Sequence, residues 1–343
     1  MDRLASLRAT LEPMSTLRPS LWLQLARGRS LIPLLLLCIP LSSKAESPNA
    51  KPAGSTAVQS SAMEPFHVIE DIVYLQPGRD EKMDLYLPAR GPGDSPAPAV
   101  IWVHGNGSNK ASGRIRDECL TFTSAGYICA SIDWTLDTPF RVLPILDCKN
   151  AVRFLRVHAK EYHIDPSRIA IGGGSGGGYL ASMVGFTAGE VGFEPPEPYP
   201  GVSSAVGAVI DFYGGYDGRR FPLVQRQLAV LPLDMAGVRP ALTQIDLFQP
   251  VNHLASSVPP VLIVQGREDP LIDYHQAIEM DRDLTAKGVP HELVLMDHVG
   301  HAFTFTTDGD HLLPRDLRPI VLAFLGKYLG TADRSPQTTG HAQ

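Results

Sequence analysis

The chain is poor in several residue types, and each shortage excludes a class of protein. Only four of its 343 residues are cysteine, which is too few for a disulfide-stapled scaffold. Charged residues make up 19% of the chain, the formal net charge is −6, and the body has no run of Lys or Arg. This balance argues against nucleic acid as the main partner, so a small molecule or a polymer is the better expectation.

Long apolar runs are also scarce. No segment beyond the N-terminal region reaches the ~20 apolar residues that a transmembrane helix needs. With 44% hydrophobic residues over 343 positions, the chain can still bury a full core. We therefore expect one large globular domain or two small ones.

The first 45 residues have the pattern of an export signal. Three arginines precede the apolar run Leu31–Ile39, and Ser43-Lys-Ala45 places small residues at the −3 and −1 positions of a cleavage site. We expect a secreted or periplasmic mature protein without stable membrane insertion. Cys38 raises lipidation as an alternative, which the two leucines before it disfavour, and a signal retained uncleaved in the membrane stays open.

The remaining chain divides into a linker, a domain and a tail. Residues 46–63, rich in Ser, Ala and Pro, predict a flexible linker, residues 64–330 a globular domain and residues 331–343 a disordered tail. Three cysteines follow the signal, so at most one disulfide can form within the chain. Cys129 lies in a strand-like run, whereas Cys119 and Cys148 lie in predicted helices.

From Phe66 onward, apolar β-rich runs alternate with helical patterns, which is typical of an α/β sheet. The central runs are continuously apolar, as in parallel strands covered on both faces, and the first two are spaced to pair as an antiparallel hairpin. The less regular segment between Gly214 and Pro260 is expected to form a small cap or an excursion over the carboxyl edge of the sheet. The eight predicted strands are His67–Gln76, Lys82–Pro88, Ala99–Val103, Tyr127–Trp134, Arg168–Ile171, Val206–Phe212, Val261–Val264 and His291–Met296. The predicted helices are Arg114–Ala125, Ile145–Glu161, Gly176–Thr187, Tyr274–Lys287 and Pro314–Tyr328.

The run Ile169–Tyr179 contains one serine among six glycines, between a β-type segment and a helical one. Strand, GxSxG and helix in this order describe a nucleophile elbow, in which a sharp turn exposes the serine hydroxyl. Gly173 and Gly177 bracket the serine, and Gly176 would begin the helix. Ser175 is therefore the candidate nucleophile.

The same glycines also spell GxGxxG, the dinucleotide-binding fingerprint, through Gly172, Gly174 and Gly177. An acid, Glu194, lies twenty residues beyond Gly174, where the fingerprint expects the end of a strand. However, residues 190–201 contain four prolines and indicate a loop, and at least four strand-like segments precede the motif. The nucleotide-binding interpretation is therefore disfavoured.

An elbow serine needs a base and a group that orients the base. In the order Ser, acid, His, Asp269 directly follows a predicted strand and would accept a hydrogen bond from the imidazole. Glu268 and Asp273 are neighbouring alternatives, and Asp269 could instead only cap the next helix.

The loop after the last predicted strand supplies the base. His301 follows a glycine that lets the loop turn inward, and it is favoured over its rival His298. The other histidines considered, His158, His163 and His253, are interpreted as structural.

A tetrahedral intermediate also needs donors for its oxyanion. The strand that ends at Val103 runs into His104-Gly-Asn-Gly107, the position of an HGGG-type oxyanion loop. We expect the backbone N–H of Asn106, with Gly105 as second choice, to act together with that of Gly176. His104 is expected to hydrogen-bond backbone and shape the loop.

In these motifs, the chain from Phe66 to Leu329 resembles the α/β-hydrolase superfamily, in the esterase/lipase branch that includes bacterial feruloyl- and acetyl-esterase-like proteins. Three features depart from the usual pattern of the branch: Asn106 replaces the middle glycine of HGGG, Thr135 stands where arginine is common, and Gln265 replaces a frequent histidine. Further matching segments are Ser131–Trp134, Asp147–Phe154, Asp165–Ile169 and Phe212–Gly214.

The resemblance implies an α/β-hydrolase fold with a mostly parallel eight-stranded sheet and helices on both faces, and residues 64–330 as its catalytic domain. It implies a carboxylic ester hydrolase that acts through an acyl-enzyme on a small-molecule or saccharide ester and needs no metal or organic cofactor. Alternatives are a prolyl-oligopeptidase-like peptidase, which the lack of a large N-terminal β-propeller region disfavours, and an idle hydrolase fold used for binding. Four acids that could gather a cation are interpreted as a solvated loop: Glu190, Glu194, Glu197 and Asp217.

Overall fold

A computed structural model describes residues 66–90, 93–136, 142–220 and 246–330. The predicted signal, linker and tail lie outside these residues. Of the predicted cap, only the two flanks, 214–220 and 246–260, are described, and they contain the short 3₁₀ helices η2 (Gly218–Arg220) and η3 (Pro250–His253).

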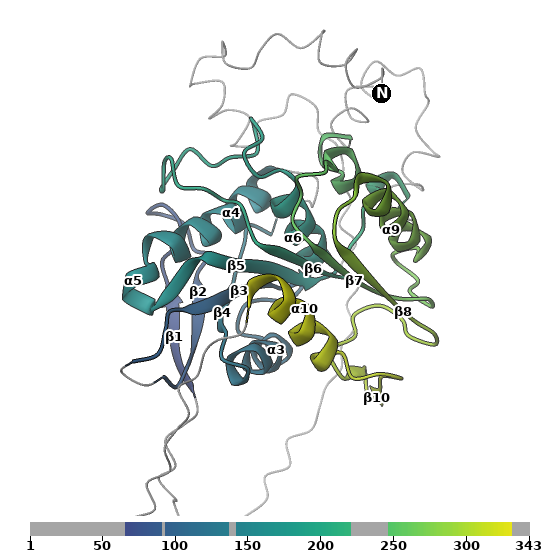
Figure 1. The fold of residues 1–343 in the computed structure, drawn as a ribbon, viewed down its shortest axis with the longest axis horizontal. Helices are drawn as coiled ribbons and strands as arrows, with labels where there is room; N and C mark the ends of the chain where they lie inside the picture. The colour runs from purple at the N-terminus through teal and green to yellow at the C-terminus, as the bar shows by residue number, and fades with distance from the viewer. Residues whose placement is uncertain (1–65, 91–92, 137–141, 221–245, 331–343) are drawn as a thin grey trace, which may run out of the picture. The chain divides into compact units, whose positions relative to one another are not determined.

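The described residues form an eight-stranded sheet in the order β1-β2-β4-β3-β5-β6-β7-β8 (Figure 1). The hairpin β1–β2 and the pair β2–β4 are antiparallel, and every other neighbouring pair in this sheet is parallel. The strands are β1 (Phe66–Ile72), β2 (Met83–Pro88), β3 (Ala97–Val103), β4 (Ile128–Ile132), β5 (Ile164–Gly174), β6 (Ala208–Phe212), β7 (Val261–Gly266) and β8 (His291–Met296). The predicted mostly parallel sheet is confirmed.

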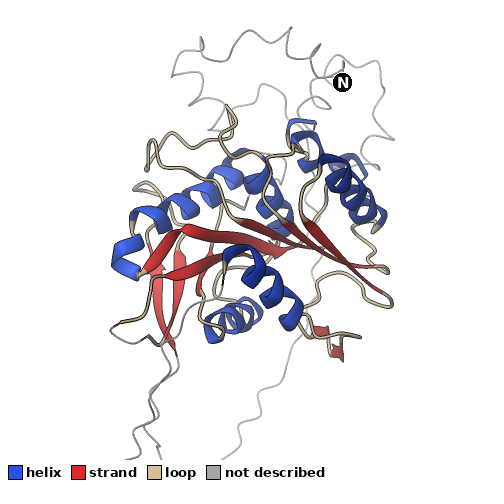
Figure 2. Cartoon of the chain, in the orientation of Figure 1, coloured by secondary structure: helices blue, strands red, loops and turns tan. Residues whose placement is uncertain are grey.

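Helices cover both faces of the sheet (Figure 2). The central strand β3 is buried throughout, with Ile101 and Val103 in the core under one layer of helices and Val100 and Trp102 in the core under the other. One layer comprises α4 (Val142–Val157), α6 (Gly176–Phe186) and α9 (His275–Lys287), and the other α3 (Gly113–Ser124) and α10 (Arg318–Leu329). Burial on both faces explains the continuous apolar runs of the sequence.

Several predicted boundaries are wrong. The helix expected at Ile145–Glu161 is two helices, because α4 ends at Val157 and α5 (Ala159–Tyr162) follows after His158. His163 then ends α5 in the left-handed conformation, with φ of 58°. β5 begins at Ile164, four residues before the predicted start, and β1 ends at Ile72. The short hairpin β9 (Thr307–Asp308) and β10 (His311–Leu312) was not predicted.

The three cysteines of the domain are free and buried, one on α3, one on β4 and one on α4. Burial raises the pKa of the Cys119 and Cys148 thiols. Across the described ranges, no helix is both long enough and apolar enough to cross a membrane.

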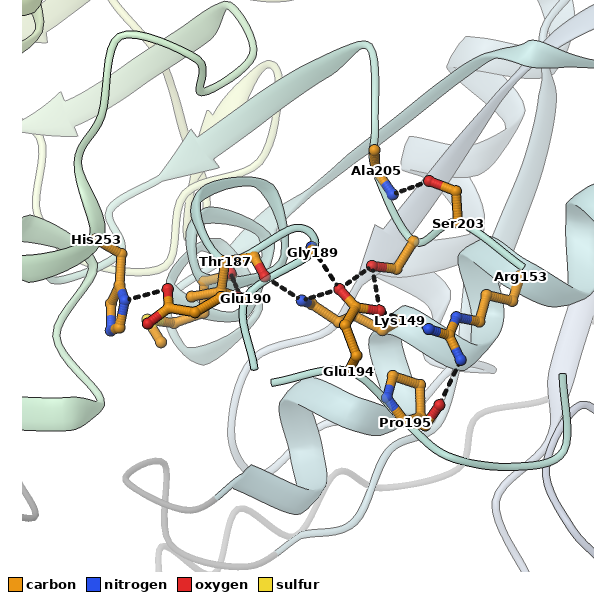
Figure 3. Close-up of polar contacts among 12 residues, drawn as sticks. Lys149, Arg153, Thr187, Gly189, Glu190, Glu194, Pro195, Ser203, Ala205 and His253 are labelled. Carbon is orange, nitrogen blue, oxygen red and sulfur yellow. Dashed lines mark hydrogen bonds and ion pairs between the residues drawn. The ribbon is translucent and has the colours of Figure 1, made fainter. Parts of the chain in front are cut away.

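The acidic loop between α6 and β6 is fastened to α4 by charged side chains (Figure 3). Lys149, whose side chain has no exposed surface, donates to the Glu194 carboxylate at 2.8 Å and to the Thr187 carbonyl at 2.7 Å. Arg153 and the Ser204 hydroxyl also bind the Glu194 carboxylate. The prediction of a solvated loop is therefore wrong for Glu194, whose carboxylate faces buried cations of the protein itself.

Candidate active site

The turn between β5 and α6 has the sharp geometry that the glycine pattern predicts. Ser175 has φ of 57° and ψ of −121°, a strained conformation for a residue with a side chain. A Cβ atom on Gly173 would lie 2.2 Å from the Val103 carbonyl oxygen, and one on Gly177 would lie 2.0 Å from it. Both positions therefore require glycine, because β3 packs directly against the turn.

The structure brings Ser175, His301 and Asp269 into one hydrogen-bonded chain. His301 Nε2 lies 2.9 Å from Ser175 Oγ, and His301 Nδ1 lies 2.7 Å from Asp269 Oδ2. These residues follow β5, β8 and β7, whose carboxyl ends lie at the same edge of the sheet.

The rival residues lie elsewhere. His298 is exposed and pairs with Glu268, its Nδ1 atom 2.8 Å from the carboxylate. Asp273 binds His275 and Arg220. None of these side chains replaces His301 or Asp269 in the hydrogen bonds that lead to Ser175.

Asp269 is both a turn-capping residue and the partner of His301. Its Oδ1 atom accepts from the backbone N–H groups of Leu271 and Ile272, and its Oδ2 atom accepts from His301 and from Gln265 Nε2 at 3.0 Å. The side chain has no exposed surface. Burial alone would raise the pKa of Asp269, but the hydrogen bonds from His301 and the backbone hold this pKa below its usual value, so the carboxylate stays charged.

The loop after β3 lies against the turn that carries Ser175. A Cβ atom on Gly105 would lie 3.2 Å from Ser175 Cβ, and one on Gly176 would lie 3.4 Å from the backbone nitrogen of Asn106. The two predicted donors, at Asn106 and Gly176, are thus neighbours beside the serine. As expected, His104 binds backbone, with Nδ1 2.9 Å from the Gly105 carbonyl oxygen.

Three contacting residues were not predicted. Gln265, treated only as a departure from the usual histidine, donates to Asp269. Tyr213, within the matching segment Phe212–Gly214, lies with its ring against the imidazole of His301, with 4.9 Å between the ring centroids. Arg114, in the first turn of α3, donates to the carbonyl oxygen of Ala302 at 2.6 Å. The only signal for the first two was their position directly at a strand end, and Arg114 had none.

This fold and this arrangement define a class. A serine on a strained turn, a histidine within hydrogen-bond reach and a buried carboxylate behind the histidine are the parts of an α/β-hydrolase active centre. Among the described residues, no group of three or more His, Cys, Asp or Glu side chains is arranged to hold a metal ion.

Comparison with known proteins agrees with the assignment to the α/β-hydrolases. Residues 83–284 match the BD-FAE family, and the chain belongs to this α/β-hydrolase esterase family. LipM of Mycobacterium tuberculosis, named as a carboxylic ester hydrolase, is 30% identical over 225 residues, which cover 60% of this chain and 49% of LipM. The chain thus spans about half the length of the curated relatives it matches.

Solved structures show the same fold. Esterase 2 of Thermogutta terrifontis in its apo form is 25% identical, with a TM-score of 0.64 over 80% of this chain and 98% of that one. A truncated carbohydrate esterase from gut microbiota is 21% identical, with a TM-score of 0.61 over 78% of this chain and 98% of that one.

Proposed function

We propose that the protein hydrolyses carboxylic esters through an acyl-enzyme, with Ser175 as nucleophile, His301 as general base and acid, and Asp269 as the orienting carboxylate. The observation that carries the proposal is the hydrogen-bonded chain from Asp269 through His301 to Ser175 at the tip of a strained turn. Membership of the BD-FAE family and the likeness to named esterases support it.

In the acylation step, Ser175 Oγ attacks the carbonyl carbon of the ester while His301 Nε2 accepts the hydroxyl proton. The imidazole becomes cationic, and the charged Asp269 carboxylate at Nδ1 stabilises it. The bond from carbon to the alcohol oxygen then breaks, and His301 returns the proton to the departing alcohol. Water repeats the sequence, with His301 as base, and releases the carboxylic acid from Ser175.

The backbone N–H groups of Asn106 and Gly176, with Gly105 as second choice, are the proposed donors to the oxyanion of both tetrahedral intermediates. Their support is the contact between the loop after β3 and the first turn of α6. Each such donor contributes a factor of about 10²–10³ to the rate in well-studied hydrolases. The proposal assigns no role to a metal or organic cofactor.

The proposed nucleophile is tested by labelling the full-length chain with a fluorophosphonate, which reacts with activated serines. We expect one label per chain in the wild type, no label in Ser175→Ala, and full label in Ser203→Ala as the matched control. An unlabelled wild type, or equal labelling of Ser175→Ala, contradicts the proposal.

The reaction class is tested with a panel of esters of different acyl lengths, including acetylated and feruloylated saccharides, alongside a peptide amide. We propose small-molecule or saccharide esters as substrates, and a carbohydrate esterase among the structural neighbours supports the second group. Faster turnover of the amide than of every ester would favour the peptidase instead.

Export is part of the proposal. N-terminal sequencing of the protein recovered from the medium or periplasm should begin at Glu46, directly after the predicted cleavage site at Ala45. A protein that keeps its first 45 residues and stays with the membrane fraction contradicts cleavage and favours the uncleaved signal.

A further inference from the structure

The loop that carries His301 has an unusual backbone. His298 and Ala302 both have positive φ angles, 60° and 69°, in a region that residues with side chains seldom adopt. On one side of His301, the backbone N–H of Gly300 donates to Asp308 at 2.9 Å. On the other side, the backbone carbonyls of the loop are bound by a side chain from a distant helix. A loop in this conformation needs such partners to hold it.

That side chain is Arg114. Its Nη1 atom donates to the carbonyl oxygen of Ala302 at 2.6 Å, and its Nη2 atom donates to the carbonyl oxygen of Phe303 and to the hydroxyl of Tyr213. The planar guanidinium fork thus binds two successive carbonyls directly after His301. A lysine ammonium is a single point charge without this rigid fork, so it would not hold the two carbonyls in the same geometry.

The guanidinium is itself fixed from behind. Arg114 Nε donates to Glu118 Oε1 at 3.3 Å, one helical turn further along α3. The other carboxylate oxygen of Glu118 accepts from the indole N–H of Trp102 at 2.6 Å. Glu118 and Trp102 are buried, so the network that supports the Arg114 fork lies in the core between α3 and β3.

Tyr213 extends the network to the nucleophile turn. Its hydroxyl donates to the carbonyl oxygen of Phe303 at 3.0 Å, and its ring meets the imidazole of His301 edge to face. A Cβ atom on Gly174, the residue before Ser175, would lie 2.2 Å from the tyrosine hydroxyl. The tyrosine therefore fills the space between the serine turn and the histidine loop.

We infer that Arg114 and Tyr213 are positioning residues, which hold the backbone after His301 and the imidazole itself so that Nε2 faces Ser175 Oγ. The inference rests on the proposed ester hydrolysis. Neither residue exchanges a proton with the substrate. They keep His301 Nε2 within hydrogen-bonding distance of Ser175 Oγ. A misplacement of about 1 Å can lower a rate about 10²-fold.

The test compares Arg114→Met with Arg116→Met in the full-length chain. Arg116 is exposed on the same helix, so its replacement removes the same charge without touching the histidine loop. We expect kcat for an ester to fall about 10- to 100-fold in Arg114→Met, with KM changed less than about threefold, and both constants to stay unchanged in Arg116→Met. Arg114→Lys should recover only part of kcat, because a single ammonium nitrogen lacks the fixed planar fork that binds the two carbonyls from separate nitrogens.

A spectroscopic signature separates positioning from a general loss of structure. The proton on His301 Nδ1, held by Asp269, should give a low-field proton NMR resonance that Asp269→Asn abolishes. We expect Arg114→Met to shift or broaden this resonance while its far-UV circular dichroism matches the wild type. Tyr213→Phe, which keeps the ring and loses the hydroxyl, should do the same to a smaller extent and lower kcat about 3- to 10-fold. If Arg114→Met does not fold, Tyr213→Phe tests the positioning role on its own.

The two proposals can fail separately. A wild type that neither hydrolyses esters nor reacts with a fluorophosphonate refutes the function. Unchanged kcat and an unchanged low-field resonance in Arg114→Met and Tyr213→Phe refute the positioning role. A change in KM alone refutes it as well, because it would place Arg114 in substrate binding.

Discussion

The two partners of the buried ion pair between α4 and the loop before β6 should differ in how much their removal destabilises the fold. The Lys149 side chain is wholly buried, and its ammonium group donates to the Glu194 carboxylate and to the Thr187 carbonyl oxygen. Glu194 is about a quarter exposed and binds Arg153 and Ser204 as well. Removing the carboxylate therefore strands a buried ammonium, whereas removing the lysine leaves a carboxylate that keeps other partners.

Loss of one partner of a buried ion pair costs about 3–5 kcal/mol of unfolding free energy. Because Glu194 is partly exposed, we expect Glu194→Ala to cost about 3 kcal/mol, near the lower end. Lys149→Met should cost only about 1 kcal/mol, because methionine fills the same buried space and the Thr187 carbonyl still accepts from the N–H of Glu190. The double variant should then be more stable than Glu194→Ala by about 2 kcal/mol.

Urea unfolding followed by circular dichroism at pH 7, with linear extrapolation, measures these differences. Burial already lowers the pKa of Lys149, and the loss of Glu194 should lower this pKa further. A lysine whose pKa is lowered in the folded state destabilises that state as long as the lysine is protonated. The loss of unfolding free energy in Glu194→Ala, relative to the wild type, should therefore shrink as the pH rises from 7 towards 10. A double variant less stable than Glu194→Ala would refute the reasoning, as would a deficit that grows with pH.

Two further predictions concern carboxylates near the site. Asp269→Asn should leave the fold intact but lower kcat about 10³- to 10⁴-fold in an ester assay, because the amide no longer fixes the imidazole tautomer; a loss below about tenfold would contradict its orienting role. Asp211 is fully buried in β6, and burial raises its pKa to about 6 against opposing hydrogen bonds from Ser182 and the N–H of Gly214. An acid with a raised folded-state pKa contributes stability below its unfolded pKa of about 4 and loses this contribution as the pH rises through 6. In urea unfolding, the unfolding free energy of the wild type minus that of Asp211→Asn should therefore rise by up to about 3 kcal/mol as the pH falls from 7 to 4. A difference that falls over the same range would contradict the assignment.

The parts of the site that a local pattern encodes could be predicted from the sequence. The glycines that a tight turn demands point to Ser175 as the candidate nucleophile, and the apolar strands before Asp269 and His301 point to these two candidates. The sheet followed for the same reason, since strands buried on both faces are continuously apolar. These signals lie within a few residues of the positions they identify.

The rest depends on contacts between distant parts of the chain. Arg114 lies 188 positions from Ala302, and only the packing of α3 under the histidine loop brings the two together. The early start of β5 was missed because Asp165-Pro-Ser167 has the composition of a turn, although Ile164 already pairs with Ala97 of β3. The prediction for Glu194 is wrong because its cationic partners belong to α4, where nothing in the sequence indicates that the charged residues are buried.

The hydrogen bond between Ser175 and His301 joins positions 126 residues apart, and His301 follows β8, which pairs with β7 at the edge of the sheet. We expect a long-range contact of this kind to form late in folding, because closing so large a loop costs entropy before the contact can compensate for it. The recovery of enzymatic activity during refolding should therefore report when β8 joins the sheet. We expect the activity to return only after the secondary-structure signal has recovered, and no fragment that ends before β8 should turn over an ester at all.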